Sequence, residues 1–439
     1  MLKKTTKIFY VISSFLAMVN SCVFAQSLES SLEQKPEDNA AVYYEKAFSL
    51  LKEYSREEIR EFNAVIENGW KGENNKLDNV LRENEQALKE IENGLRLEKC
   101  YFTYNKTYRY LSQKPLPNMW KIHLIARLFI LKGRMLERDN NFKQAMEEYL
   151  SLLKFSRHIS QGGSLVETMM SVAMANMAHK VLSQYLVRID AHQEITQKIQ
   201  AFLKMQELNA SQIVAVAECE KKSWLSAMQE LVDRLMKEIE ANKRKTIFPW
   251  IQRQGKDFYA SLVPYAEVLG DKYYGKLIKA AQTNMLADRQ EYEKEVARLN
   301  KEIEFSVTHV IKAMLRINIK EYTVKLSLSL MLSDAKFLDN FYFSMTQFRI
   351  LQTVAAIKMY YFEKTFMPET LNNLVPEFFV ELPKDPYSQQ ALKFEKTGKG
   401  FVIYSIGKDR QDNSGKGSFD KDSAGQDIIL NFEAPEAER

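Results

Sequence analysis

The chain has few of the residues that build tight turns and disulfide frameworks. It contains 15 glycines and 10 prolines in 439 residues, and this scarcity favours long helices over extensive sheets. Of its three cysteines, only Cys100 and Cys219 lie beyond the first 25 residues. They allow one disulfide in an oxidising compartment, but they indicate neither a disulfide framework nor a zinc site. Two free, buried thiols are favoured over a bond.

A strong excess of one charge is also missing. The formal net charge is +5, with 27% charged and 45% hydrophobic residues, which is the composition of an ordinary folded protein. Without the three lysines of the first 25 residues, which contain no acid, the charge falls from +5 to +2. Such a balance predicts neither nucleic-acid binding nor strong attraction to a membrane surface.

The first residues have the pattern of an export signal. Three lysines precede an apolar run over 8–25 that contains no charge, and residues 1–25 are therefore predicted to be a signal peptide. Simple cleavage after Ala25 is favoured, because the alternative, a lipobox ending in a lipidated Cys22, contains an unusual asparagine. An uncleaved anchor is a third possibility. We expect an exported protein of the periplasm or cell envelope, in contact with the membrane only through the signal or a lipid anchor.

Signatures of catalysis are absent from the sequence. It contains no H-E-x-x-H, G-x-S-x-G or phosphate-binding glycine loop, so a non-enzymatic role is favoured. The five histidines are expected to be surface or capped residues, and carboxylates such as Glu218 and Glu220 are expected on solvated helix faces. An exported hydrolase with carboxylates converging from separate helices is the alternative.

Helical periodicity dominates from about residue 39 to residue 365. Asp38-Asn39 offers an N-cap for the first helix, and Ser164 and Glu167 have the spacing of a capping box. Proline-containing breaks lie at 114–120 and 248–255. The first ends one helix before the next begins, and the second divides the chain into an N-terminal helical region over 26–246 and a second helical region over 247–340. The run at 242–256 mixes basic and aromatic residues, and a solvated linker is favoured there over a nucleic-acid or membrane site.

One pair of helices is better defined than the others. Gly133 is followed twelve residues later by Ala145 and then by Tyr149, a step that resembles a tetratricopeptide hairpin, in which small residues let two antiparallel helices approach closely. No second copy occurs at the same period, so a generic helical hairpin is favoured. Methionines gather in the next helix, where core packing is favoured over a binding groove. The methionines are Met169, Met170, Met174 and Met177.

The C-terminal residues change to a strand-and-turn pattern. A helix is predicted to end before Pro368, followed by a short helical turn over Leu371 and Leu374. A hairpin is predicted over 392–394 and 401–404 with a turn at 397–400, and a last strand over 428–430. The predicted fold is therefore mainly α: an array of helical hairpins followed by a small α+β module at 341–432, with a disordered tail at 433–439.

The order of short motifs in this module resembles the soluble end of the major pseudopilin of type II secretion. The matching pieces are Phe366-Met367-Pro368, Leu382-Pro383-Lys384-Asp385-Pro386, Tyr404-Ser405-Ile406-Gly407-Lys408-Asp409 and Asp427-Ile428. The resemblance covers about the last 85 residues. The chain lacks the processing motif of that family, and its corresponding helix follows some 300 polar and amphipathic residues, so a filament subunit of the usual kind is not expected. The whole chain also resembles uncharacterised exported proteins of planctomycete-type bacteria, which assigns no activity.

The pseudopilin resemblance implies a calcium-binding loop. Hard oxygen ligands suited to calcium crowd the corresponding segment, although acidic loops rich in glycine are often simply solvated. The candidate ligands are Asp409, Asp412, Asp422 and Asp427. We therefore expect an interaction or scaffold protein of the cell envelope with a protein partner and a terminal module that calcium could stabilise. The sequence also leaves room for a role in a secretion or pilus-like apparatus.

Overall fold

Capping side chains set where several of the helices begin. The computed structural model describes residues 38–70, 72, 74–102, 118–188, 193–205, 210–241, 261–283, 286–303, 336–397, 400–420 and 426–433. The Asn39 side chain accepts a hydrogen bond from the Ala41 amide and starts α2 (Ala40–Leu50), and Ser55 and Glu58 form a capping box at α3 (Arg56–Asn68). Asn74 caps α4 (Asn75–Glu83). The N-cap predicted at residues 38–39 is thereby confirmed.

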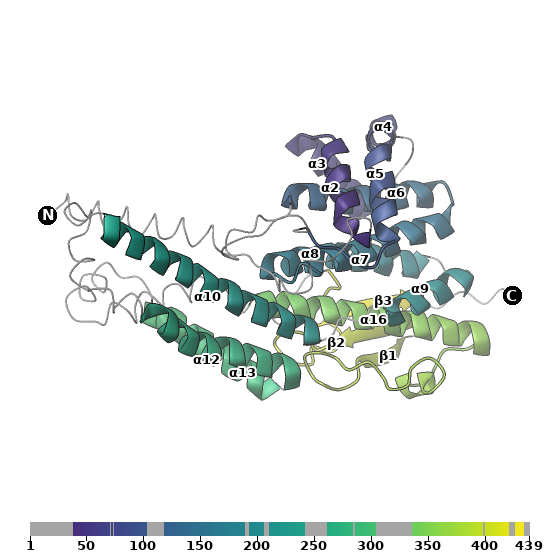
Figure 1. The fold of residues 1–439 in the computed structure, drawn as a ribbon. Helices are drawn as coiled ribbons and strands as arrows, with labels where there is room; N and C mark the ends of the chain where they lie inside the picture. The colour runs from purple at the N-terminus through teal and green to yellow at the C-terminus, as the bar shows by residue number, and fades with distance from the viewer. Residues whose placement is uncertain are drawn as a thin grey trace.

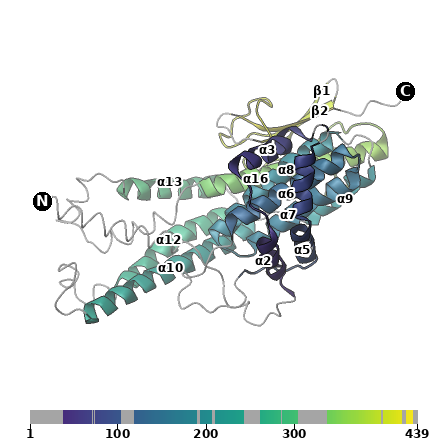
Figure 2. The same cartoon turned by 90° about the horizontal axis from the view of Figure 1, so that it is seen from above.

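Twelve α-helices lie among the described residues, and the predicted mainly helical class is confirmed. After α2 to α4 come α5 (Glu85–Leu95), α6 (Met119–Arg138), α7 (Phe142–Ser160), α8 (Leu165–Arg188), α9 (Gln193–Met205), α10 (Ala210–Ala241), α12 (Leu262–Thr283), α13 (Leu286–Ile303) and α16 (Lys336–Lys364). Figures 1 and 2 show α10 and α12 side by side, extending away from the stacked helices. The 32 residues of α10 span about 48 Å. Among the described residues, no helix has both the length and the apolarity to cross a bilayer.

The predicted hairpin is formed by α6 and α7. A Cβ atom on Gly133 would lie 2.3 Å from the Tyr149 ring, so the absence of a side chain there allows the close approach of the two helices. A similar contact occurs between α2 and α5, where a Cβ on Gly94 would lie 2.5 Å from the Tyr44 ring. The resemblance to a tetratricopeptide repeat stays a prediction, whereas the close approach is confirmed.

The hairpin ends in a buried polar cluster. The Arg134 side chain is 1% exposed and pairs with Glu137, which also accepts hydrogen bonds from the Tyr149 hydroxyl at 2.6 Å and pairs with Arg188 at 2.6 Å. Arg134 further donates to the Ile66 carbonyl at 3.2 Å, on α3. One carboxylate thus pairs with two guanidinium groups where α3, α6, α7 and α8 meet.

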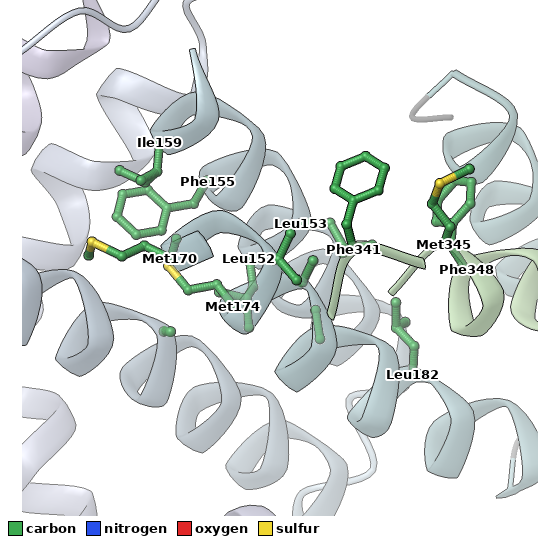
Figure 3. Close-up of a cluster of buried hydrophobic side chains, with 14 of the residues drawn as sticks. Leu152, Leu153, Phe155, Ile159, Met170, Met174, Leu182, Phe341, Met345 and Phe348 are labelled. Atoms are coloured by element: carbon green, nitrogen blue, oxygen red, sulfur yellow. The ribbon is translucent and has the colours of Figure 1, made fainter. Parts of the chain in front are cut away.

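The hydrophobic core runs from α7 through α8 to α16. Figure 3 shows Phe155 of α7, Met170 and Met174 of α8 and Phe341 of α16 in one buried cluster. Core packing of these methionines is confirmed, although Met169 on the same helix is 40% exposed. Because α16 packs against α8, α9 and the sheet, nearly every side chain between residues 337 and 360 is buried.

A small sheet follows the helices, as predicted. The turn of helix is η3 (Leu371–Leu374), and the strands are β1 (Lys393–Thr397), β2 (Gly400–Ser405) and β3 (Ile428–Glu433) in the order β1-β2-β3. Both pairs are antiparallel, with Phe394 opposite Ile403 and Ile403 opposite Leu430. The sheet packs against α16 and α8. Of the tail predicted at 433–439, Glu433 belongs to β3, and the remaining residues, like the signal at 1–25, lie outside the described residues.

The proposed domain boundaries stay predictions. The boundary at 246/247 lies outside the described residues, and the helices on its two sides, α10 and α12, pack along each other. The boundary at 340/341 falls within α16. Cys100 and Cys219 are buried thiols that form no disulfide, as predicted. Burial raises the pKa of the Cys100 thiol, which keeps the thiol protonated.

Candidate functional site

Two of the motifs behind the pseudopilin resemblance meet at Asp385. This carboxylate is 1% exposed, and its Oδ1 accepts hydrogen bonds from the Tyr387 amide at 3.0 Å and the Ser405 hydroxyl at 2.8 Å. The Ser405 Oγ in turn accepts a hydrogen bond from the Gly407 amide at 3.2 Å. Burial raises the pKa of Asp385, and the hydrogen bonds it accepts oppose that rise. Asp385 therefore fixes the turn after residue 382 against the end of β2.

Asp427 organises the loop that connects β2 to β3. Its carboxylate is buried and accepts hydrogen bonds from the amides of Asn413 at 3.3 Å and Gly415 at 2.8 Å. A Cβ on Gly417 would lie 1.7 Å from the Asp427 carbonyl oxygen, so only glycine fits at that point. Burial raises the pKa of Asp427. This side chain has a structural role in folding the loop back on itself.

The other predicted calcium ligands also bond to their own loop. Asp409 accepts hydrogen bonds from the Gln411 amide at 3.1 Å and the Asn413 amide group at 3.3 Å. Asp412 accepts hydrogen bonds from the Ser414 amide and the Tyr404 hydroxyl. Across the part of the chain that the structure describes, no three acidic, histidine or cysteine side chains are grouped to hold a metal ion.

Asp422 lies outside the described residues. The three described carboxylates at 409, 412 and 427 do not by themselves form a calcium ligand set. Asp409 and Asp427 accept hydrogen bonds from their own loop, whereas Asp412 also bonds to Tyr404 of β2 and pairs with Lys393 of β1 at 3.3 Å. The calcium site stays a prediction that depends on the segment containing Asp422.

An ion-pair network fixes this loop to the helices. Asp339, in the first turn of α16, pairs with Arg289 of α13 at 2.7 Å and with Lys408 of the module. The Arg289 guanidinium also lies over the Tyr342 ring at 4.3 Å and the Tyr387 ring at 5.5 Å. Cation–π contacts of this kind add to the ion pair when they are shielded from water. The network therefore joins α13, α16 and the module.

Further polar contacts join the module and α16 to the helical array. Gln347 of α16 donates a hydrogen bond to the Phe419 carbonyl at 2.7 Å, and Lys180 of α8 pairs with Asp420 at 3.0 Å. Gln352 donates to the Leu203 carbonyl at the end of α9 at 3.0 Å. The buried Lys358 ammonium donates to the Leu186 carbonyl near the C-terminus of α8, where the helix dipole favours a positive charge.

Two histidines are buried, contrary to the expectation that all would be surface or capped residues. His158 is 2% exposed, and its Nδ1 lies 2.5 Å from the Tyr44 hydroxyl. His179 is 1% exposed beside Phe348 of α16. Burial lowers the pKa of each to about 4. Both sit on helix faces that neighbouring helices cover, a feature that the local sequence did not show.

Glu220 corrects a second expectation, because it is buried and not on a solvated face. It is 4% exposed on α10, and its Oε1 accepts a hydrogen bond from the Leu165 amide at 2.7 Å. Burial raises its pKa to about 7, and the nearby Glu167 charge contributes to the rise. Glu167 itself completes the predicted capping box, since its carboxylate accepts a hydrogen bond from the Ser164 amide at 3.3 Å and its own amide donates to the Ser164 hydroxyl at 3.3 Å. The two glutamates therefore both act at the N-terminus of α8.

A surface hollow of about 840 Å³ lies where α4, α5 and α6 meet. Its apolar lining comes from Leu81, Leu88 and Met135. The polar lining includes Asn75, Asp78, Asn79, Arg82, Glu85, Lys89, Glu92 and Lys132. A smaller hollow of about 510 Å³ shares Asn75 and Asp78 with it and adds Gly72, Arg138 and Asp139. No local sequence pattern indicated this hollow, because it arises from the packing of three helices.

Comparison with protein-family models, curated proteins and solved structures gave no match. The pseudopilin resemblance therefore rests on the motifs at 366–368, 382–386, 404–409 and 427–428 and on the order of elements around them. The basic and aromatic run at 242–256 and the predicted lipidation site at Cys22 lie outside the described residues.

Proposed function

We propose that this protein is a non-enzymatic interaction or scaffold protein of the cell envelope, exported by the signal at 1–25. The packing of α16 carries this proposal. This helix would correspond to the helix that precedes the sheet in pseudopilins, but here its faces are covered by α8, α9 and the sheet. A helix buried in its own chain cannot pack into a filament, so the module serves as a fixed part of the helical array.

Several surface features favour binding over catalysis. The hollow between α4, α5 and α6 is open to solvent, and its lining offers both apolar and charged side chains to a partner. The module exposes two large apolar side chains, Phe366 at 56% and Val380 at 96%. An association with a secretion or pilus-like apparatus is the sharper form of the proposal, and it rests on the motif resemblance.

Photo-crosslinking in the intact envelope tests the proposal. A photoreactive amino acid at Val380 would probe the module, and one at Val268, which is 67% exposed on α12, would serve as the comparison. Neither substitution disturbs the core. We expect specific adducts with an envelope protein at Val380 after irradiation, and their identification would show whether secretion components are involved. A third photoreactive residue at Arg82 would probe the hollow. Absence of adducts at all three positions would contradict an interaction role.

The hydrolase alternative has one observation in its favour. Glu167 of α8 and Glu220 of α10 are buried carboxylates that converge from separate helices. Against it, the hydrogen bonds of both serve the N-terminus of α8, and neither lines the hollow described above. In a strain that lacks the protein, Glu220→Gln protein should restore the wild-type phenotype fully if the protein acts by interaction. Stable Glu220→Gln protein that fails to restore function would favour the hydrolase.

A further inference from the structure

The hairpin of α10 and α12 projects from the rest of the protein (Figures 1 and 2). Among the described elements, α10 packs mainly along α12 and has a smaller contact with α8. Trp224 of α10 is 1% exposed and packs on α12, where a Cβ on Gly270 would lie 2.8 Å from its ring. Residues 221–241 of α10 extend beyond Glu220, about 32 Å of helix. A small rotation near Glu220 therefore displaces the far end of the hairpin.

The hairpin is joined to α8 through a buried carboxylate. Glu220 of α10 is 4% exposed, and its Oε1 accepts a hydrogen bond from the Leu165 amide at 2.7 Å. Leu165 is the first residue of α8, and the first amides of a helix have no partner within that helix. In turn, α8 packs against α7 and α16. This hydrogen bond therefore connects the projecting hairpin to the helical array.

Within the part of the chain that the structure describes, no positive side chain pairs with Glu220. The charged group of α8 that faces it is Glu167, a second acid. Lys221, the next residue of α10, pairs instead with Asp271 of α12. A negative charge on Glu220 is therefore buried beside another carboxyl group and without a counter-ion, which is a costly arrangement.

The titratable groups that α12 and α13 place nearby are phenols. Tyr274 and Tyr292 are 2% and 5% exposed, and burial raises the pKa of both. The hydroxyls of Tyr274 and of Ser223, one turn along α10 from Glu220, have no hydrogen-bond partner among the described residues, so neither donates to the Glu220 carboxylate. The neighbouring Cys219 thiol is buried as well. These surroundings suit the protonated form of Glu220 better than the ionised form.

We propose that the junction of α8 and α10 is a pH-dependent seat, from which the α10–α12 hairpin detaches as a unit when Glu220 loses its proton. Detachment gives the carboxylate access to water and leaves α10 packed on α12. Burial raises the pKa of Glu220 from 4.5 to about 7 in the docked arrangement, and exposure restores the ordinary value. Glu220 therefore favours docking fully below pH 4.5, and this contribution is lost as the pH rises through 7. Such a seat does not require the proposed interaction role.

Double electron–electron resonance on the full chain would measure the detachment. Spin labels are attached to a ketone-bearing amino acid at two exposed positions, Lys237 of α10 and Glu147 of α7. We expect mainly one distance at pH 5.5 and a second, displaced population at pH 8. The ratio of displaced to docked molecules should rise at least about tenfold between these pH values. A pKa difference of about 2.5 limits the rise over the whole pH range to about 300-fold.

Two variants and a second label pair are the controls. Glu220→Gln cannot ionise and should keep the pH 5.5 distance at both pH values, whereas Glu218→Gln, at an exposed position of the same helix, should behave like the wild type. Labels at Lys237 and at Val268 of α12 should keep one distance, because the hairpin moves as a unit. An unchanged distribution in the wild type at pH 8, or an equal change in Glu220→Gln, would overturn the proposal. A change between Lys237 and Val268 would also overturn it, since the hairpin itself would then come apart.

Discussion

Replacing the buried Glu220 with glutamine should make the protein more stable at alkaline pH. Burial raises the pKa of this carboxyl from the ordinary 4.5 to about 7, so the folded protein binds its proton more tightly than the unfolded chain does. The contribution of Glu220 to stability is therefore most favourable below pH 4.5 and is lost as the pH rises to 7. The difference of roughly 2.5 in pKa corresponds to about 3 kcal/mol.

Glutamine keeps the shape of the side chain and the acceptor for the Leu165 amide, which lies 2.7 Å from Glu220 Oε1, but it has no charge to bury. Between pH 5 and pH 8 the wild-type protein should therefore lose about 2 to 3 kcal/mol of unfolding free energy relative to Glu220→Gln. The two buried histidines are the same in both proteins, so their titration cancels in this comparison.

Urea denaturation at pH 5, 6, 7 and 8, followed by tryptophan fluorescence, would measure this difference. Trp224 lies one turn further along α10 and is 1% exposed, so unfolding of this region changes its surroundings. Glu218→Gln, at an exposed position of the same helix, is the matched control and should show no such trend. If the difference in unfolding free energy between Glu220→Gln and wild type stays constant with pH, the buried environment assigned to Glu220 is refuted.

Three further substitutions test the helical packing through the free energy of unfolding. Gly133→Ala should destabilise the protein by about 1 to 3 kcal/mol, because the added Cβ would lie 2.3 Å from the buried Tyr149 ring. Gly275→Ala in α12 should instead stabilise the protein by up to about 1 kcal/mol, because its Cβ would meet nothing within 4 Å. Glu137→Ala leaves the buried Arg134 guanidinium without its carboxylate and should destabilise by about 3 to 5 kcal/mol. Equal effects of the two glycine substitutions, or a loss below about 1 kcal/mol for Glu137→Ala, would contradict the packing described.

The terminal module was the part of the fold most readily predicted from sequence. Its elements are short, and proline, glycine and alternating apolar residues mark their ends within a few positions. The helix starts at Ser164 and Asn39 were predicted from equally local signals, since a capping side chain bonds to amides two or three residues away. The glycine at 133 indicated a close helix approach because the facing aromatic residue lies only sixteen positions further on.

Burial between distant segments could not be predicted in the same way. Glu220 lies on a helix with polar neighbours. The amide that binds it belongs to Leu165, the first residue of α8, which is 55 residues earlier in the sequence. His179 is covered by α16, more than 150 residues away in sequence. The hollow depends on how α4 and α5 meet at Asn84 and on the distance of both from α6. These features arise from tertiary packing, which periodicity along one helix does not encode.

The helix α16 is shared by the helical array and the terminal module, and amide hydrogen exchange of the full chain tests this arrangement directly. We predict that the amides between about residues 345 and 360 are among the slowest to exchange, together with those of α8, because opening α16 would require both the sheet and α9 to separate from it. Exchange of α16 as fast as that of an exposed helix, with the array still protected, would contradict the central claim.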